Sequence, residues 1–490
     1  MIRAITPSIA SGVDRRIWWL IAAIGCFAVL VMKEISLPSL VVMAFGGLAL
    51  LGLLMVGVQD PRVPLYVLVA YLPFSLELVG DFGTQATALN LTNILIVWVL
   101  LGHVASCLSR NEPLMTGTSL SKVIGLFCLL GAVALMRGTF QYGSWYLTAA
   151  LTPLKRWLTP MLLYFLALWV VRDRRTMKTI VVIIMTAVTV AAIMAIREYL
   201  WISGGSFESS RVEGIAGHSN TLGAFFNYYM FLFLGYFLVF ARRPRAWWLL
   251  VPFLLCFRGI MVTFSRGAYL AFAAGSLASC FFHRKLLFIC AVFLGLIALA
   301  NPILLPAGIR YRMGMTVVEH AAGFEHGDIT ESLETSAATR IEIWRGAVKM
   351  IQEHPWWGVG YGAFPHFIPR YTKVSVGHLD AHNSYLLIAA EMGLPTLLTF
   401  LIVLGMAWYY TYWLFRHATD RSMKAMALGF LGGLTGLVVA NMFGSRMDAQ
   451  VVSSYFWILC GLMMRGVVIE KGAKLEARSR KPEKLHARHS

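Results

Sequence analysis

Long apolar segments joined by short polar loops make up most of the chain. We count about fourteen of them, most about 17 to 22 residues long, the length a helix needs to cross the hydrocarbon core of a bilayer. Helices of a soluble core would carry a polar face, and these segments mostly do not. The pattern predicts an all-α polytopic membrane protein. The predicted spans lie near residues 17–32, 37–58, 63–79, 90–108, 121–136, 157–171, 177–199, 219–240, 247–264, 268–283, 286–305, 394–415, 424–443 and 449–465.

Basic residues cluster in alternate loops between these segments. Because cytoplasmic loops are enriched in lysine and arginine, we expect the basic loops and both termini to be cytoplasmic. The basic loops lie near residues 15–16, 62, 110–122, 172–178, 242–245, 284–285 and 416–424, with a basic tail after them. The outer loops are then residues 80–89, 137–156, 201–218, 265–267, 306–383 and 444–448.

The outer loop of residues 306–383 is by far the longest. Connections beyond about 15 residues are uncommon unless they are functional or disordered. We expect an amphipathic helix at Ala337–Ile351, followed by a helix stop and two interfacial tryptophans in Pro355-Trp-Trp-Gly. The apolar residues at helical spacing are Ile341, Trp344, Val348 and Ile351. This loop is therefore predicted to fold as a cap on the outer surface.

The same pattern divides the chain into five parts. They are an N-terminal transmembrane bundle (1–205), central transmembrane helices (206–305), an outer catalytic loop (306–393), C-terminal transmembrane helices (394–466) and a basic cytoplasmic tail (467–490). No small-residue cleavage site follows the first apolar run, so we expect that run to be a retained span.

Composition narrows the range of functions. The net charge is +18, from 42 lysines and arginines against 24 aspartates and glutamates. Such an excess in a soluble domain would suggest nucleic acid. Here the cations lie in loops and in the tail, so we expect contacts with membrane lipids and none with nucleic acid. The seven cysteines lie mostly inside apolar segments without paired spacing, which predicts neither a disulfide framework nor a zinc site.

Three arginines lie on the predicted outer face, where the positive-inside rule predicts few cations. Arg266 lies in the tight turn of a helical hairpin, Arg340 begins the amphipathic helix, and Arg211 precedes Asn220 in an outer loop. Guanidinium groups bind phosphate bidentately and stay charged, so a cluster of them suits a diphosphate. The alternative, above all for Arg211, is contact with lipid headgroups.

Arg258 differs because it lies about two turns below Arg266 in the same predicted span. An arginine at that depth is costly and is usually paired or faces a cavity. Glu77 and Glu391 are candidate partners. A structural ion pair and a substrate contact both fit the sequence.

His378, Asp380 and His382 form a His-x-Asp-x-His pattern near the end of the long loop. The three side chains would share one side only in an extended strand, and no further firm ligand is apparent, so we expect no metal. Alternatively, one histidine acts as a general base that Asp380 orients. His382 is favoured because Asn383 and Ser384 can cap the following helix. A purely structural role in that cap fits equally well.

The Gly358-Val-Gly-Tyr-Gly362 run resembles a phosphate-binding fingerprint only superficially. It follows a helix and two tryptophans, whereas the fingerprint follows a strand and opens a helix. We interpret the run as a turn that allows close backbone packing, and we expect no nucleotide cofactor.

Four ordered motifs resemble the bacterial O-antigen ligase and polymerase family. The first two are Arg211–Asn220, ending in Gly-His-Ser-Asn, and Phe264-Ser-Arg-Gly-Ala-Tyr-Leu270. The third is Arg340-Ile-Glu-Ile-Trp followed by His354-Pro-Trp-Trp-Gly-Val-Gly-Tyr-Gly-Ala-Phe364. The fourth is His382-Asn383 with Gly393 and Thr396, similar to the ligase pattern His-[Asn/Ser/Gln]-x9-Gly-x-x-[Gly/Thr/Tyr]. The resemblance covers roughly residues 205–400.

This resemblance implies an enzyme that moves a glycan from undecaprenyl diphosphate to an acceptor hydroxyl at the periplasmic face of the bacterial inner membrane. The transfer would invert the anomeric centre without a metal or another cofactor. Arg266 and Arg340 would hold the diphosphate and stabilise its charge as it leaves, and His382 would activate the acceptor. Further substrate contacts are expected at Arg211, Asn220, Arg258, His378, Asp380 and Asn383.

The acceptor and the subfamily stay open. The acceptor hydroxyl could belong to a lipid A core sugar, to another repeat unit of an O-antigen or exopolysaccharide, or to a protein. The span count exceeds that of a typical ligase and favours a polymerase, and Arg258 has no counterpart in the family pattern. A lipid-linked sugar flippase is the rival from another class, although the internal repeats typical of transporters are not apparent. Proteins of polysaccharide export are candidate partners.

Overall fold

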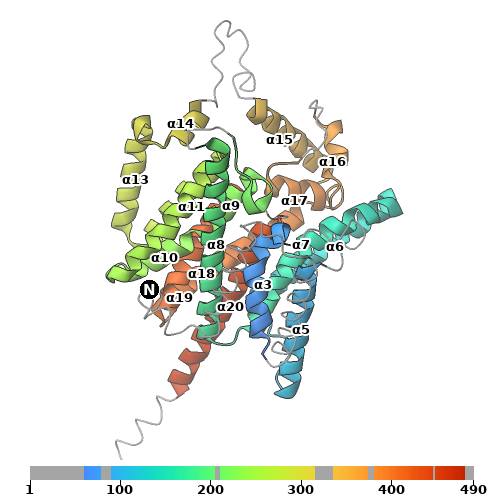
Figure 1. The fold of residues 1–490 in the computed structure, drawn as a ribbon. Coiled ribbons are helices and arrows are strands. Elements are labelled where there is room, and N and C mark those ends of the chain that lie inside the picture. The colour runs from blue at the N-terminus through green and yellow to red at the C-terminus, as the bar shows by residue number, and fades with distance from the viewer. Residues whose placement is uncertain are drawn as a thin grey trace, which may run out of the picture.

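The computed structural model describes residues 60–78, 90–204, 210–314, 335–372, 380–444, 447 and 449–479, and its regular elements there are all helices. Figure 1 shows long helices bundled together, with α14, α15 and α16 gathered at one end. The predicted spans at 17–32 and 37–58 lie outside the described residues.

The helices follow one another along the whole described chain. The first are α3 (Arg62–Tyr71), η3 (Leu72–Phe74), α4 (Ser75–Leu78), α5 (Leu91–Ser109), α6 (Ser119–Tyr142), α7 (Ser144–Val170) and α8 (Arg174–Ser203). The central ones are η4 (Gly214–Ala216), α9 (Ser219–Tyr229), α10 (Phe231–Phe240), η5 (Pro244–Leu249), α11 (Leu250–Val262), α12 (Arg266–His283), α13 (Lys285–Ala300), η6 (Pro302–Leu304) and α14 (Ala307–Gly314). The last are α15 (Thr335–Glu353), α16 (Phe364–Phe367), η7 (Ile368–Arg370), α17 (Ser384–Met392), α18 (Leu394–His417), α19 (Arg421–Ala440) and α20 (Gln450–Ser479).

Within the described residues, eight helical segments are long and apolar enough to cross a membrane, so the protein is a polytopic membrane protein. They are α5, α6, α8, α9 with α10, η5 with α11, α18, α19 and α20. The segments Arg62–Phe74 and Lys285–Ala300 are shorter apolar helices. Two more predicted spans coincide with α7 and α12, which carry Lys155, Arg156 and Arg266. The last helix, α20, continues well past the predicted end of its span at residue 465.

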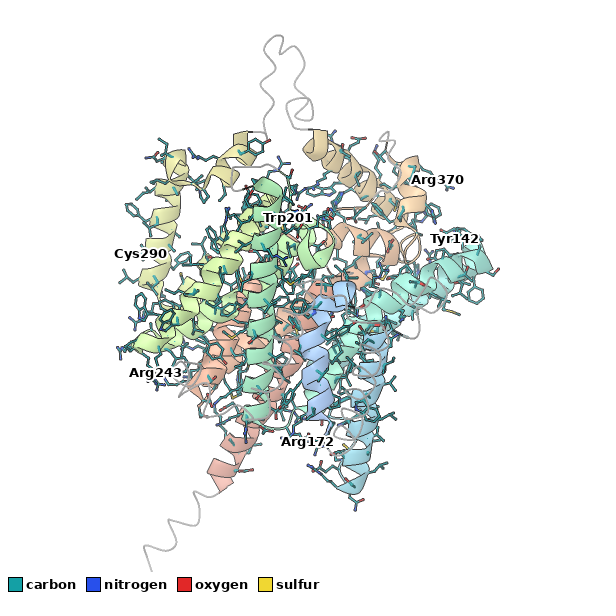
Figure 2. The ribbon with its side chains drawn as sticks, in the orientation of Figure 1. Tyr142, Arg172, Trp201, Arg243, Cys290 and Arg370 are labelled. Atoms are coloured by element: carbon teal, nitrogen blue, oxygen red, sulfur yellow. The ribbon has the colours of Figure 1, made fainter. Side chains whose placement is uncertain are left out.

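Basic loops lie toward one end of the bundle. Figure 2 places Arg172 and Arg243 toward this end and Trp201 and Arg370 toward the other. Segregation of the basic loops at one end is what the positive-inside rule expects of a membrane protein. The assignment of that end to the cytoplasm remains a prediction.

Ion pairs join the helices at the basic end. The guanidinium of Arg174 lies 2.8 Å from the buried carboxylate of Glu470, and Lys178 Nζ lies 2.6 Å from Asp420 Oδ2. Burial alone would raise the pKa of Asp420, but the hydrogen bond and charge of Lys178, together with hydrogen bonds from the Ser422 and Met423 N–H groups, lower that pKa overall. These ion pairs therefore hold together the start of α8, the α18–α19 loop and the later part of α20. The predicted basic tail (467–490) begins as part of helix α20.

Glycines line the central helix α19. This helix packs against α12 on one side and against α9 and α10 on another. A Cβ atom on Gly433 would overlap the carbonyl oxygen of Tyr228, and one on Gly429 would lie 2.6 Å from the Cα of Leu232. Close backbone approach through small residues is a main source of helix association in membranes, where lipid is as apolar as the side chains.

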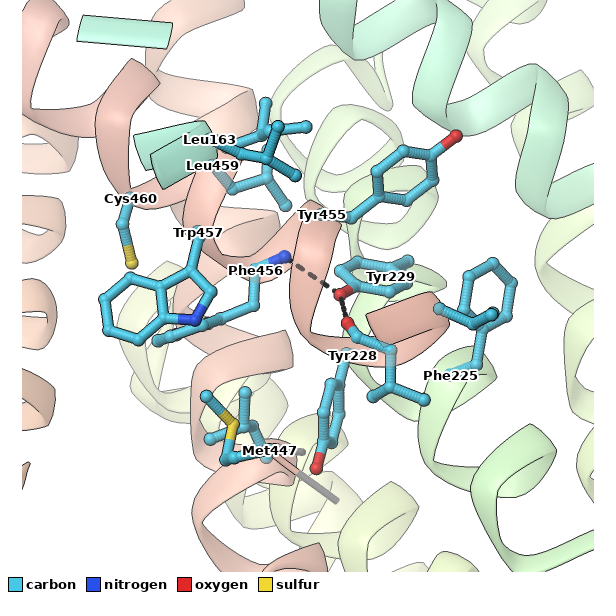
Figure 3. Packing of buried hydrophobic residues seen from close by; sticks show 14 of the residues in the cluster. Leu163, Phe225, Tyr228, Tyr229, Met447, Tyr455, Phe456, Trp457, Leu459 and Cys460 are labelled. Carbon is cyan, nitrogen blue, oxygen red and sulfur yellow. Dashed lines mark hydrogen bonds between the residues drawn. The ribbon is translucent and has the colours of Figure 1, made fainter. Parts of the chain in front are cut away.

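A buried tyrosine joins α9 to α20. The Tyr229 hydroxyl donates a hydrogen bond to the Val452 carbonyl and accepts one from the Phe456 N–H at 2.9 Å (Figure 3). Both bonds satisfy a hydroxyl that would be costly to leave unpaired in the interior. They fix α9, whose first turn contains the end of the Arg211–Asn220 segment.

Substitution of Gly433 by alanine tests the packing of α19. We expect Gly433→Ala to lower the free energy of unfolding by about 1–3 kcal/mol, because the new methyl group overlaps the Tyr228 backbone. The measurement is thermal unfolding of the detergent-purified protein. Gly405→Ala in α18 is the matched control, since its Cβ meets nothing within 4 Å and should leave stability unchanged or slightly higher. An equal loss in both variants would contradict the packing argument.

Candidate functional site

The turn between α11 and α12 forms the first part of the site. Phe264 adopts a left-handed backbone with φ of 48°, and α12 then begins at Arg266 itself. The N-terminus of a helix attracts anions through its free N–H groups and its dipole. The half-buried Arg266 therefore adds a guanidinium to an end that already favours negative charge. The tight turn predicted here is confirmed.

Arg211 braces this turn from the neighbouring loop. Its Nε donates to the Thr263 carbonyl at 3.0 Å, and its guanidinium also donates to Asn220 Oδ1. Arg211 and Asn220 thus bind each other directly beside the Arg266 turn. Their predicted contact with substrate remains a prediction.

The loop that carries Arg211 rests on Glu198 of α8. The Glu198 carboxylate accepts hydrogen bonds from the N–H groups of Glu213 and Gly214 at 3.1 and 3.0 Å. Sequence reasoning missed this supporting residue. A lone acidic residue near the outer end of an apolar span was the only signal available.

The second part of the site is the start of α17. Asn383 Oδ1 accepts hydrogen bonds from the N–H groups of Tyr385 and Leu386 at 2.9 and 3.1 Å, which confirms the predicted cap. Ser384 does not share this role as predicted. Its hydroxyl donates to Asn441 Oδ1 at 2.7 Å instead, because α19 ends against this turn.

His382 precedes the cap in a strained conformation. Its φ is 47°, a region that residues other than glycine rarely adopt and that is often associated with functional constraint. Its Nδ1 lies 3.1 Å from Asp380 Oδ2, although this buried atom makes no hydrogen bond within the described part of the chain. The Asp380 carboxylate therefore lies within ion-pair distance of the His382 ring. His378 lies outside the described residues.

Asn441, at the end of α19, ties the start of α17 to α9. It is fully buried, and its side-chain amide donates to the Tyr228 hydroxyl at 3.2 Å and the Leu437 carbonyl at 2.9 Å. Its side-chain oxygen accepts from the Ser384 hydroxyl, and its main-chain carbonyl accepts the Ser384 N–H at 2.9 Å. Each polar atom of this side chain is thus hydrogen-bonded.

The same helix end contacts the Arg266 turn. A Cβ atom on Gly267 would lie 2.9 Å from the Cβ of Phe443, so Phe443 packs directly on the backbone after Arg266. The Arg266 turn and the His382–Asn383 segment therefore meet at the residues that follow α19.

Helix α15 brings Arg340 to the same region. The Trp344 indole donates from Nε1 to the carbonyl of Ala381, the residue before His382, at 2.9 Å. Arg340 lies four residues before Trp344 and so on the same helix face. The three residues predicted to act in catalysis are therefore carried by segments that converge on one end of the bundle.

The helix predicted at Ala337–Ile351 is confirmed as α15, but its predicted apolar face is partly wrong. Val348 is 43% exposed, and the buried residues are Ile343, Gly346, Ala347 and Met350. A Cβ on Gly346 would lie 3.0 Å from the Ile368 side chain. Small residues let this face approach its neighbours closely, so size as well as hydropathy decided which face is buried.

Arg258 contacts an aromatic ring. Its guanidinium carbon lies 5.2 Å from the centroid of the Tyr199 ring on α8, and the side chain is exposed. The sequence predicted Glu77 or Glu391 as the partner of Arg258. Glu391 accepts a hydrogen bond from the Phe364 N–H at 3.1 Å, and the structure does not describe the side chain of Glu77. The contact of Arg258 with substrate stays a prediction.

The glycine run at 358–362 packs closely on α17, as predicted. The N–H groups of Val359 and Gly360 donate to the carbonyls of Ala390 and Glu391 at 2.8 and 2.9 Å. Gly393, at φ of 86°, ends α17 where a Cβ would overlap the Trp356 carbonyl. Glycine at this position is required by both backbone conformation and space.

A cleft of about 410 Å³ lies beside α17. Its lining includes Arg156, Trp157, Tyr361, Asp380, Leu387 and Glu391. Sequence reasoning did not single out Arg156 of α7, although a cation at the outer end of a predicted span was a usable signal. Among the described residues, no three histidine, cysteine, aspartate or glutamate side chains are grouped to hold a metal ion.

Removal of the Asn441 amide tests the junction, the place where α9, the start of α17 and the end of α19 meet. We expect Asn441→Leu to lower the free energy of unfolding by about 1–3 kcal/mol, because it leaves the Ser384 and Tyr228 hydroxyls without this partner. It should also lower whatever activity the site has. Thermal unfolding in detergent measures the first effect. Thr435→Ala is the control on the same helix, since that hydroxyl bonds the Leu431 carbonyl of its own helix. Equal unfolding temperatures for the two variants would refute the role given to Asn441.

One protein family matches part of the chain. A family model described as O-antigen ligase matches residues 251–401, from α11 to the start of α18. The match includes Arg266, Arg340 and His382 and leaves Arg211 outside. None of the curated proteins matches the chain. Residues 251–401 thus match an O-antigen ligase domain, and this domain lies within a multi-pass membrane protein.

Proposed function

We propose that the protein transfers a glycan from undecaprenyl diphosphate to an acceptor hydroxyl at the periplasmic face of the inner membrane, in the synthesis of cell-surface polysaccharide. One observation supports this above others. The Arg266 turn, the Arg340 helix and the Asp380–His382 pair converge where α19 ends, away from the end that gathers the basic loops.

The donor diphosphate would bind at the arginine side of this junction. Arg266 offers a guanidinium and the first N–H groups of α12 together, and Arg340 approaches on α15. Charge-assisted hydrogen bonds to phosphate are stronger than neutral ones, and they strengthen as the leaving group gains charge. Arg211 would act mainly by holding the turn through the Thr263 carbonyl.

The acceptor would react at the histidine side. His382 accepts the proton of the acceptor hydroxyl as the oxygen attacks the anomeric carbon. The bond from that carbon to the diphosphate oxygen breaks on the opposite face, and the diphosphate leaves with the electron pair. Asp380, beside Nδ1, stabilises the imidazolium that forms, as the carboxylate of a catalytic triad does. Attack opposite the leaving group inverts the anomeric centre.

Transfer by purified variants tests the assignment. Arg266→Ala, Arg340→Ala and His382→Ala should each lower the rate by about 100-fold or more, since each removes a group that acts on developing charge or on the proton. Arg211→Ala should be milder. The assay incubates protein with undecaprenyl-diphosphate glycan and acceptor and follows the products by mass spectrometry. Arg345→Ala is the control on α15, because that side chain is half exposed beside Glu342. Undiminished transfer by both Arg340→Ala and His382→Ala would falsify the assignment.

The same assay distinguishes the alternative functions by their products. A carrier-linked chain that grows longer indicates a polymerase, and glycan attached to lipid A core or to a protein hydroxyl indicates a ligase or a protein glycosyltransferase. A flippase would leave the glycan on its carrier and release no undecaprenyl diphosphate.

Activity should not depend on a divalent metal ion. Two arginines would supply the charge that a metal supplies elsewhere, so treatment with a chelator should leave the transfer rate unchanged. The measurement compares rates before and after chelation. Loss of activity that a divalent ion restores would contradict the proposal.

A further inference from the structure

We propose that the cleft beside α17 binds the acceptor as a sugar, and this inference rests on the proposed function. The cleft lies between α7, the loop around Tyr361, and the face of α17 that carries Ser384, Leu387 and Glu391. Its volume of about 410 Å³ falls within the range of about 300–1,000 Å³ typical of small-molecule sites.

The charges of the cleft favour a hydroxyl-rich ligand over a diphosphate. Its lining contains one arginine, Arg156, against two acidic residues, Asp380 and Glu391. A diphosphate would meet like charge at two of these three positions, whereas carboxylates readily accept hydrogen bonds from sugar hydroxyls. The Arg266 turn, which Arg211 braces, has the opposite character.

Aromatic rings form one corner of the cleft. The rings of Trp157 and Tyr361 lie 5.6 Å apart between centroids and are tilted by 47°. Apolar and aromatic walls with a few placed polar groups are typical of small-molecule sites, and such rings can cover the C–H face of a sugar. The corner is held in place, since the Tyr146 hydroxyl donates to the Tyr361 carbonyl and Phe127 packs edge-on against Trp157.

Asp380 links the cleft to the reacting histidine. It lines the cleft, and its Oδ2 lies 3.1 Å from His382 Nδ1. Ser384 also lines the cleft and bonds to Asn441, beyond which Phe443 packs on the Arg266 turn. An acceptor in the cleft would thus reach the histidine from a side different from that of the donor arginines. Inverting transfer needs such an arrangement, because the nucleophile attacks opposite the leaving group.

Filling the cleft tests this inference. Leu387 is half-buried on α17 and lines the cleft, so Leu387→Trp adds bulk inside it. We expect the KM for the acceptor to rise about tenfold or more, while the KM for undecaprenyl-diphosphate glycan stays within about twofold. Pro153→Trp adds bulk from the exposed wall of α7 and serves as a second variant if the first folds poorly. Leu398→Trp is the matched control, because Leu398 is 60% exposed on α18 and lies outside the cleft lining.

The two acceptor probes are lipid A–core without its glycan and a carrier-linked repeat unit. Each probe is titrated at a fixed donor concentration to give the acceptor KM. The donor is then titrated at a fixed acceptor concentration to give the donor KM. No transfer by the wild type to either probe would count against the proposed function itself. Transfer with an unchanged acceptor KM in the folded cleft variants would overturn the cleft assignment alone. A raised donor KM in those variants would also overturn it, because the cleft would then hold the donor.

Discussion

The hydrogen bonds of Asn441 hold the candidate site together. This fully buried side chain links α9 through Tyr228 and α17 through Ser384 at the point where α19 ends. An unpaired amide in such a place would be costly, so the three helix ends must meet in one arrangement to satisfy it. Phe443 then lies on the backbone of the Arg266 turn. One polar cluster thus sets where the proposed donor and acceptor sides of the site lie.

Glycine packing makes this meeting possible. Helix α19 approaches α9, α10 and α12 closely through Gly429, Gly432 and Gly433. Within a bilayer, close contact between helices has to come from such packing, since burying apolar surface from lipid gains little. The polar site at one end of the bundle therefore depends on small residues about two to three helical turns earlier in α19.

Features of the structure that arise from local sequence could be predicted. The apolar segments, the helix that became α15, the Asn383 cap and the turn at Arg266 follow from hydropathy, periodicity and capping preferences over short stretches. The role of Asn441 depends on partners far away in the chain, and so does the cleft around Arg156. The stacking of Arg258 on Tyr199 and the buried face of α15 were decided by tertiary packing, which no local pattern encodes.

In the proposed mechanism the arginines and the histidine form two sides of one site, one for a leaving diphosphate and one for an attacking hydroxyl. The most direct test follows the sugar itself through a single turnover of the purified protein with undecaprenyl-diphosphate glycan and acceptor. NMR of the product gives the anomeric configuration, and the released carrier is quantified. The account predicts an inverted linkage and one undecaprenyl diphosphate released per linkage formed. A retained configuration, or glycan that stays attached to its carrier with no undecaprenyl diphosphate released, would contradict it.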